Sequence, residues 1–279
     1  RHPADLLDEG HLDHLIRLAV VEGIDPITAI QMATLNVAEW FRLRDRGAIA
    51  PGRRADMVVF SNLEDFRAEM VFAGGQLVAQ NGEPTGEWIL PDIDSSAVRG
   101  SVEVDMDQLD LAIPAAGHEM RVIGALPDQV VTDQLIEAPK IVDGMAVADP
   151  GRDLLKIAVI ERHRGTGNVG LGFVRGLGLD RGALASTVGH DAHNLIVAGC
   201  DDTSMTTAIR AAIALEGGLV AAAGDEVLAS LPLPVGGLMS DQPVETVRQQ
   251  MDQLVETAHE LGSRLHDPFM TLGFLALEV

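Results

Sequence analysis

Residues 187–194 read TVGHDAHN, which places four polar side chains, His190, Asp191, His193 and Asn194, inside an apolar and glycine-rich stretch. Two histidines and a carboxylate could ligate a metal ion, although such a site needs at least three ligands in suitable geometry. A histidine beside an aspartate could equally serve as an acid–base pair, because the carboxylate fixes the imidazole tautomer. A hydrogen-bonded core cluster is the third possibility. The residue types alone leave structural and ligand-facing roles open.

The flanking sequence predicts where these side chains lie. Gly189 precedes them and the strand-like LIVAG of residues 195–199 follows, which favours a loop that feeds a strand. We call residues 190–194 the HDAHN loop. GTGNVG at residues 165–170 matches a dinucleotide-binding GxGxxG, but the charged residues 161–164 separate it from the preceding strand and no helix pattern follows. It predicts a flexible or closely packed loop, and because such loops often border sites it favours a ligand-facing HDAHN loop.

Three other residues that can do chemistry indicate structural roles. His11 and His14 are three residues apart and share one helix face, but no third ligand is indicated nearby, so a solvated face is predicted. Cys200 has no activating pattern around it and predicts a buried, inert thiol.

The composition restricts the possible partners. The net charge of −22 repels phosphate backbones and anionic membranes, which excludes nucleic-acid binding and favours a small neutral or cationic ligand. A single cysteine predicts a reducing, cytoplasmic setting, and no apolar run approaches the roughly 20 residues of a membrane helix. Because the chain opens with Arg1 and not with methionine, we expect a fragment or a processed product.

The first part of the chain predicts helices and then a β unit. The 3.6-residue spacing over residues 12–19 predicts one buried helical face, made by Leu12, Leu15, Ile16 and Ala19. Asp25 predicts an N-cap followed by proline at the first helical position, and Asn36 predicts the cap of one more short helix. Residues 47–60 predict two strands about a turn at Pro51, and Gly74-Gly75 predicts the turn of a hairpin.

The rest of the chain predicts an α/β or α+β domain. Residues 154–160 and 195–198 read as strands, and Asp202 or Thr203 predicts the cap of a helix that ends before Gly217. Residues 219–230 predict a hairpin, 231–243 an extended loop, and 244–261 a long amphipathic helix. We divide the chain into helices (1–46), a small β domain (47–90), a connector with little core of its own (91–118) and a C-terminal α/β domain (119–279).

Several phrases resemble known proteins. ATLNVAEWF and GAIAPGRRADMVVF resemble the end of an amidohydrolase-superfamily enzyme, in which the (β/α)8 barrel leads into a small β-sandwich domain. KIAVIERH, TVGHDAHN, GGLV, VLASLPLPVGGLMSD and DPFMTLGFLAL resemble the C-terminal half of the bacterial adenine deaminase family. The fold class that this implies is multi-domain α/β and α+β: the end of a metallo-hydrolase barrel, a small β-sandwich and a C-terminal α/β domain.

The resemblance implies hydrolytic deamination of adenine to hypoxanthine and ammonia, in which a hydroxide bound to two divalent ions (Mn, Fe or Zn) attacks the ring. The family's paired metal-ligand histidines come as H-x-H, and no H-x-H occurs in these 279 residues. The last barrel aspartate is expected just before Arg1. We therefore expect the metals to be held by a missing N-terminal barrel half, and the chain alone to be inactive.

The resemblance also gives the HDAHN loop an expected role. We expect His190, Asp191, His193 and Asn194 to contact the purine or to position the groups that do, because a mostly neutral ring needs a few fixed donors and acceptors. A homo-oligomer is expected in the intact protein. Two alternatives remain: a non-catalytic ligand-binding or assembly module, and an amidohydrolase that acts on another purine or a cyclic amide.

Overall fold

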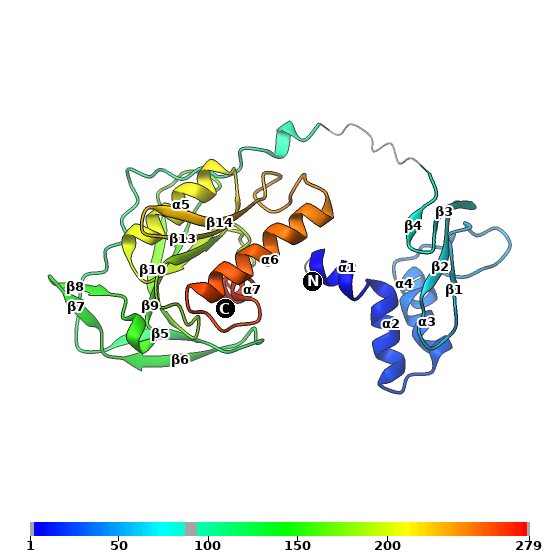
Figure 1. The fold of residues 1–279 in the computed structure, drawn as a ribbon, viewed down its shortest axis with the longest axis horizontal. Helices are drawn as coiled ribbons and strands as arrows, with labels where there is room; N and C mark the ends of the chain where they lie inside the picture. Colours follow the sequence, from blue (N-terminus) through cyan, green and yellow to red (C-terminus); the bar gives the residue numbers. More distant parts are fainter. Residues whose placement is uncertain (1–2, 87–93, 278–279) are drawn as a thin grey trace. The chain divides into compact units, whose positions relative to one another are not determined.

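The computed structural model describes residues 3–86 and 94–277, and the chain divides into two compact units, Arg1–Ile93 and Asp94–Val279 (Figure 1). Each unit combines helices with β-sheet, which confirms the mixed α/β class. No helix in the described ranges is both long and apolar enough to cross a membrane. The two units are described separately below.

The first unit opens with four short helices, α1 (Pro3–Asp8), α2 (Leu12–Val21), α3 (Pro26–Ala33) and α4 (Leu35–Trp40). Asp25 caps α3 as predicted, since its carboxylate accepts the Thr28 N–H at 3.0 Å. The predicted Asn36 cap is wrong. The chain turns at Thr34, so Asn36 already lies in the first turn of α4, and the Thr34 hydroxyl donates back to the Ile30 carbonyl of α3.

The apolar face predicted for α2 is buried only in part. Ile16 packs in a small core with Ala29 and Phe66, whereas Leu12 and Leu15 are 44% and 49% exposed. The 3.6-residue period therefore located the apolar stripe correctly, but only Ile16 and Ala19 of the four predicted residues pack against this core. Other large apolar side chains of these helices are exposed as well, and they include Leu18, Ile27, Met32, Val37, Trp40 and Phe41.

A four-stranded antiparallel meander completes the first unit, with strands β1 (Met57–Phe60), β2 (Ala68–Ala73), β3 (Gln76–Gln80) and β4 (Glu83–Pro84). The predicted hairpin turn is confirmed: Gly74 and Gly75 take φ of 58° and 83° between β2 and β3. The strand predicted just after residue 47 does not form. Gly47 turns with φ of 90° against α4, where a Cβ would lie 2.6 Å from the Ala38 Cβ, so the backbone is bent there and not extended.

The second unit is built on an eight-stranded sheet in the order β14-β13-β11-β12-β9-β10-β5-β6. All neighbours pair antiparallel except β5 and β10, which are parallel. The strands are β5 (Met120–Ala125), β6 (Thr132–Glu137), β9 (Leu155–Ile160), β10 (Val169–Arg175), β11 (Ala183–Ser186), β12 (Leu195–Gly199), β13 (Gly218–Ala223) and β14 (Glu226–Pro232). A separate hairpin, β7 (Lys140–Val142) and β8 (Met145–Val147), and two short 3-10 turns, Ser96–Val98 and Pro150–Arg152, complete it.

Helices cover both faces of this sheet (Figure 1). On one face α5 (Asp202–Ala214) packs Met205 and Ile209 against Ala158 of β9. On the other, α6 (Val244–Glu260) and α7 (Pro268–Phe274) form a core that includes Leu254 of α6 and Ile157 of β9. Because side chains of a strand alternate between faces, successive residues of β9 enter different cores, which explains its unbroken apolar run.

Most of the elements predicted for this unit are confirmed, namely β9, β12, the β13–β14 hairpin and α6. Two details are wrong. Asp201, and neither Asp202 nor Thr203, caps α5, since its carboxylate accepts the Ser204 N–H at 2.7 Å. Strand β14 also runs on through Pro232, where an extended loop was predicted; proline is tolerated there because β14 is an edge strand.

Residues 94–118 lie against the large sheet through a buried lysine. Leu111 is 6% exposed and joins the α5-side core. The Lys156 ammonium of β9 is 3% exposed and donates to the Leu111 carbonyl at 2.9 Å and to the Asp202 carboxylate at 2.5 Å. One side chain therefore connects this segment, the sheet and the start of α5.

We predict that Lys156→Met lowers the free energy of unfolding by about 1–3 kcal/mol, because it leaves the buried Leu111 carbonyl without its donor. Asp202→Asn is the matched control. It keeps the Leu111 bond and changes a half-exposed carboxylate, so less than about 1 kcal/mol is expected. Urea unfolding of the 279-residue chain measures both, and equal losses would contradict the anchoring role of Lys156.

We predict that Cys200 stays unreactive in the folded chain. Burial, and then the carboxylates of Asp201, Asp180 and Asp153, raise the pKa of this thiol to about 12. The reactive thiolate is therefore scarce at neutral pH, and alkylation by iodoacetamide at pH 8 should be on the order of a hundredfold slower than in urea. Equal rates in buffer and urea, followed by mass spectrometry, would show that the thiol is accessible.

Candidate functional site at the ends of strands β11 and β12

The HDAHN loop lies between two central strands. β11 and β12 pair antiparallel, and every residue of both is buried. Thr187, which follows β11, is fully buried, and its hydroxyl donates to the Gly237 carbonyl at 2.6 Å and accepts the Gly218 N–H at 2.8 Å. The chain therefore leaves the core at Thr187 and re-enters it at β12. This confirms the prediction of a loop that leads into a strand.

Helix α7 supports the first half of the loop. The His190 N–H donates to the Gly273 carbonyl at 3.0 Å, and the His190 ring stacks on Phe274 with centroids 4.7 Å apart and planes at 16°. Gly273 is required for this approach, since a Cβ there would lie 2.7 Å from the Val188 carbonyl oxygen. Stacking on an aromatic ring fixes the orientation of the His190 imidazole.

His193 occupies the second half of the loop with a left-handed backbone, φ 51°, and its N–H donates to the Gly189 carbonyl at 2.6 Å. Its ring centroid lies 6.0 Å from that of His190. The His193 Nδ1 atom is buried, and no hydrogen-bond partner for it exists among the described residues. The two predicted histidines are thus brought together, with one ring atom left for a further hydrogen bond.

The surroundings of His193 favour its neutral form. Burial is the largest cause that lowers the pKa of His193, followed by positive charge at His190 and Arg162, with a smaller contribution from His163. Asp191 opposes this shift but sits exposed at the tip of the loop. A neutral imidazole can donate through one nitrogen and accept through the other, which suits recognition of a heteroaromatic ring.

Two residues that follow β9 brace the loop, and the motif analysis did not identify either. The Arg162 Nε–H donates to the His193 carbonyl at 2.6 Å, and the His163 Nε2 atom lies 2.9 Å from the Ala192 carbonyl oxygen. Both belong to the charged stretch 161–164, which separates the glycine-rich loop from β9 and whose first three residues end the family-like phrase KIAVIERH. Asn194 is half-buried where the loop enters β12.

The glycine-rich loop 165–170 leads into strand β10 and not into a helix. The Glu161 carboxylate accepts the N–H groups of His163, Arg164 and Thr166 and the Thr166 hydroxyl, and these bonds lower the pKa of Glu161 to about 2. Of these N–H groups that of Thr166 belongs to the loop, and a Cβ on Gly167 would lie 2.8 Å from the Gln108 Oε1 atom. These contacts favour a closely packed loop over a phosphate site.

The residues of this chain do not fit the binuclear metal centre that the resemblance implies. Within residues 3–86 and 94–277, no three His, Cys, Asp or Glu side chains are grouped so that they could hold a metal ion. The exposed Asp191 does not complete a ligand set with the two histidines. The described residues of this chain therefore give no basis for assigning a metal-dependent reaction step to it.

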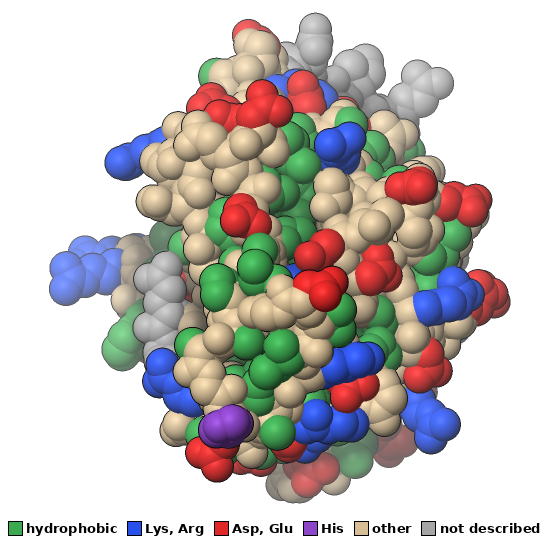
Figure 2. All heavy atoms as spheres, turned by 90° about the vertical axis from the view of Figure 1, so that its left-hand side faces the viewer, with side chains coloured by type: hydrophobic (Ala, Val, Ile, Leu, Met, Phe, Trp, Pro, Cys, Tyr) green, Lys and Arg blue, Asp and Glu red, His purple; other side chains and the backbone are tan. Residues whose placement is uncertain are grey.

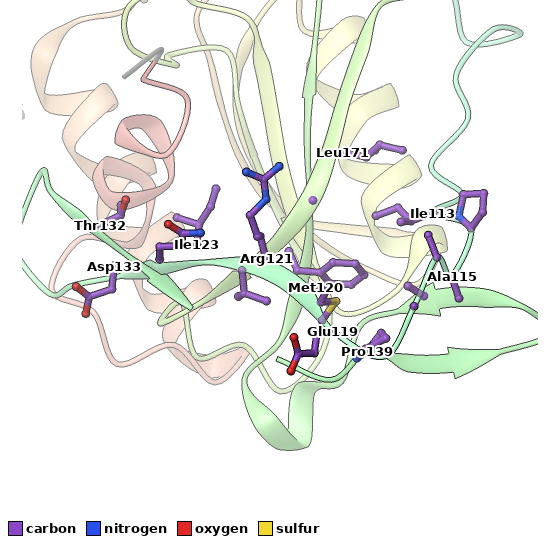
Figure 3. A pocket seen from close by; sticks show the side chains of 18 residues that line it. Ile113, Ala115, Glu119, Met120, Arg121, Ile123, Thr132, Asp133, Pro139 and Leu171 are labelled. Atoms are coloured by element: carbon purple, nitrogen blue, oxygen red, sulfur yellow. The ribbon is translucent and has the colours of Figure 1, made fainter. Parts of the chain in front are cut away.

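A cleft of about 700 Å³ lies elsewhere in the second unit, between residues 113–117 and strands β5, β6 and β10. Figure 3 shows labelled charged side chains, Glu119, Arg121 and Asp133, around apolar ones such as Met120. The HDAHN histidines do not line it. On the molecular face shown in Figure 2, apolar side chains likewise lie in small groups between acidic and basic ones.

Comparison with known proteins covers both units. The family described as adenine deaminase C-terminal domain matches residues 129–279, and the amidohydrolase family matches residues 3–78. The chain is 51% identical over 279 residues to a protein named adenine deaminase from Desulfatibacillum aliphaticivorans. It is 46% identical to adenine deaminase 2 of Carboxydothermus hydrogenoformans over 284 residues, and 47% identical to an adenine deaminase of Nitratidesulfovibrio vulgaris over 283 residues.

Each of these alignments includes 100% of this chain and 48–49% of the relative. The chain thus spans about half the length of the curated relatives it matches. The resemblance stated from the sequence phrases is confirmed at both ends of the chain, since one family covers the first unit and the other most of the second. The chain therefore belongs to the adenine deaminase C-terminal domain family.

Proposed function

We propose that this chain is the C-terminal portion of an adenine deaminase, which hydrolyses adenine to hypoxanthine and ammonia in the cytoplasm. The observation that carries the proposal is identity of 46–51% along the entire chain to proteins named adenine deaminase. The alternatives were a non-catalytic ligand-binding or assembly module and an amidohydrolase that acts on another purine or a cyclic amide, and the names of these relatives favour neither.

The proposal divides the work between the chain and an N-terminal half. Residues 1–46 would be the end of a (β/α)8 barrel, 47–90 a small β-sandwich domain, 91–118 a connector, and 119–279 the C-terminal α/β domain. The exposed apolar side chains of α2 to α4 support this, because large apolar patches usually mark a covered surface. The two divalent ions, Mn, Fe or Zn, would be held by the N-terminal half, and a homo-oligomer is expected.

Within this enzyme, the HDAHN loop would contact the adenine ring. His190 is held by α7 and Phe274, and His193 carries a buried Nδ1 atom that lacks a partner in the described part of the chain. Purine nitrogens and the exocyclic amine need fixed donors and acceptors, which neutral imidazoles and the Asn194 amide supply. Asp191, exposed at the loop tip, would orient the loop or the ring.

We predict that His190→Ala and His193→Ala, made in a protein that also contains the N-terminal half, each raise KM for adenine about tenfold or more. Loss of one hydrogen bond to a bound ligand costs about 1–2 kcal/mol, and 1.4 kcal/mol is a factor of ten. Ammonia release under steady-state conditions measures this. His118→Ala, at an exposed histidine outside the loop, should leave KM unchanged. If both loop variants behaved like the control, the cluster would be structural.

We predict that the isolated 279 residues release no ammonia from adenine at an enzymatic rate, with or without added manganese, iron or zinc. The described residues contain no group of side chains that could hold a metal ion. Addition of a separately produced N-terminal half, loaded with metal, should restore activity. Intact mass of each sample excludes contamination by full-length enzyme, and turnover by the chain alone would refute the division of labour.

A further inference from the structure

Arg162 is a buried cation without an acidic partner. Its side chain is 1% exposed, and within residues 3–86 and 94–277 no ion pair includes it. Burial lowers its pKa, but an arginine remains charged under all ordinary conditions. A buried unpaired charge is costly, so its retention calls for a specific use.

The guanidinium of Arg162 is bonded to three segments that are distant in the sequence. Nε donates to the His193 carbonyl at 2.6 Å, Nη1 donates to the carbonyl and hydroxyl oxygens of Ser101 at 2.9 and 3.2 Å, and Nη2 donates to the Gly236 carbonyl at 3.1 Å. All these acceptors are neutral. The rigid fork of the guanidinium therefore sets the distance between the HDAHN loop, residue 101 and residue 236.

The space for Arg162 is provided by Gly237. This glycine has φ of 71°, and a Cβ on it would lie 2.6 Å from the Nη1 atom of Arg162. Its carbonyl accepts the hydroxyl of Thr187, the residue that leads from β11 into the HDAHN loop. Gly237 thus contacts the guanidinium and also binds the residue that leads into the loop.

We propose that Arg162 is the positioning residue of the candidate site: by binding the His193 carbonyl it fixes where the His193 imidazole lies, and it holds that ring beside a permanent positive charge. The proposal rests on the proposed function for its catalytic meaning, but its structural part stands on the chain itself. Arg162 acts through His193 and is too deeply buried to reach a ligand.

The charges around His193 support the second part. His190, His163 and Arg162 lower the pKa of His193 and Asp191 raises it. The guanidinium of Arg162 stays charged under all ordinary conditions. Its removal should therefore leave His193 easier to protonate.

The first test uses the 279-residue chain and nitrogen-15 NMR of its imidazoles. Arg162→Gln should raise the pKa of His193, because a nearby like charge is removed. Arg162→Lys keeps the charge but not the fork, so the pKa should stay low while the loop signals broaden. Arg164→Gln is the control, since Arg164 is exposed and two residues away. An unchanged His193 pKa in Arg162→Gln would overturn the proposal.

If Arg162→Gln fails to fold, Gly237→Ala gives a second route, because the added methyl displaces the guanidinium without removing it. A rise in the pKa of His193 in Gly237→Ala supports the proposal. An unchanged His193 pKa in a variant whose arginine is displaced overturns it. Thermal unfolding of every variant separates a folding defect from a local one.

The second test uses the protein with its N-terminal half. Arg162→Lys should raise KM for adenine about as much as His193→Ala while changing kcat less, and the double variant should be no worse than His193→Ala alone. Additive effects would overturn the positioning role. If His190→Ala and His193→Ala leave KM unchanged while Arg162→Gln still shifts the His193 pKa, the positioning stands and the proposed role of the loop fails.

Discussion

Burial of both faces of the large sheet is the constraint on which the rest of the second unit depends. Strands β9, β11 and β12 contribute side chains to a core with α5 on one face and to a core with α6 and α7 on the other. Polar groups are therefore confined to the strand ends, where the backbone leaves the two cores. The HDAHN loop is such an end, and hydrogen bonds to α7 and to Arg162 hold it there.

The same constraint explains the two buried cations near the ends of β9. Lys156 reaches the Leu111 carbonyl and Arg162 reaches carbonyls of Ser101, His193 and Gly236. Arg162 is bonded to neutral oxygens alone, whereas Lys156 is also paired with the Asp202 carboxylate, and both bind a backbone oxygen of a segment that forms no strand in the large sheet. Cations near the strand ends thereby attach irregular segments to the sheet. Apolar strand faces alone would not bind the backbone oxygens of these segments.

Local patterns in the sequence were sufficient for β9, β12, α5, the β13–β14 hairpin and α6, because an apolar run or a 3.6-residue period is a property of neighbouring residues, but β5, β6, β10, β11 and α7 were not predicted. They were not sufficient for Arg162, whose partners are 31, 61 and 74 residues away. At Gly47 a contact with α4 prevailed over strand propensity. Leu12 was predicted buried because periodicity identifies an apolar face but does not identify what covers it. The HDAHN loop itself was found from residue types, whereas its supports came only from the fold.

The stacking of His190 on Phe274 has a consequence for how the protein is made. Helix α7 follows the loop by a long stretch of chain, since all of β12, α5, β13, β14 and α6 lie between them. During synthesis on the ribosome His190 therefore lacks its stacking partner Phe274 until α7 has emerged and packed against the sheet. The loop acquires its final geometry late, after the sheet that carries it has already been translated.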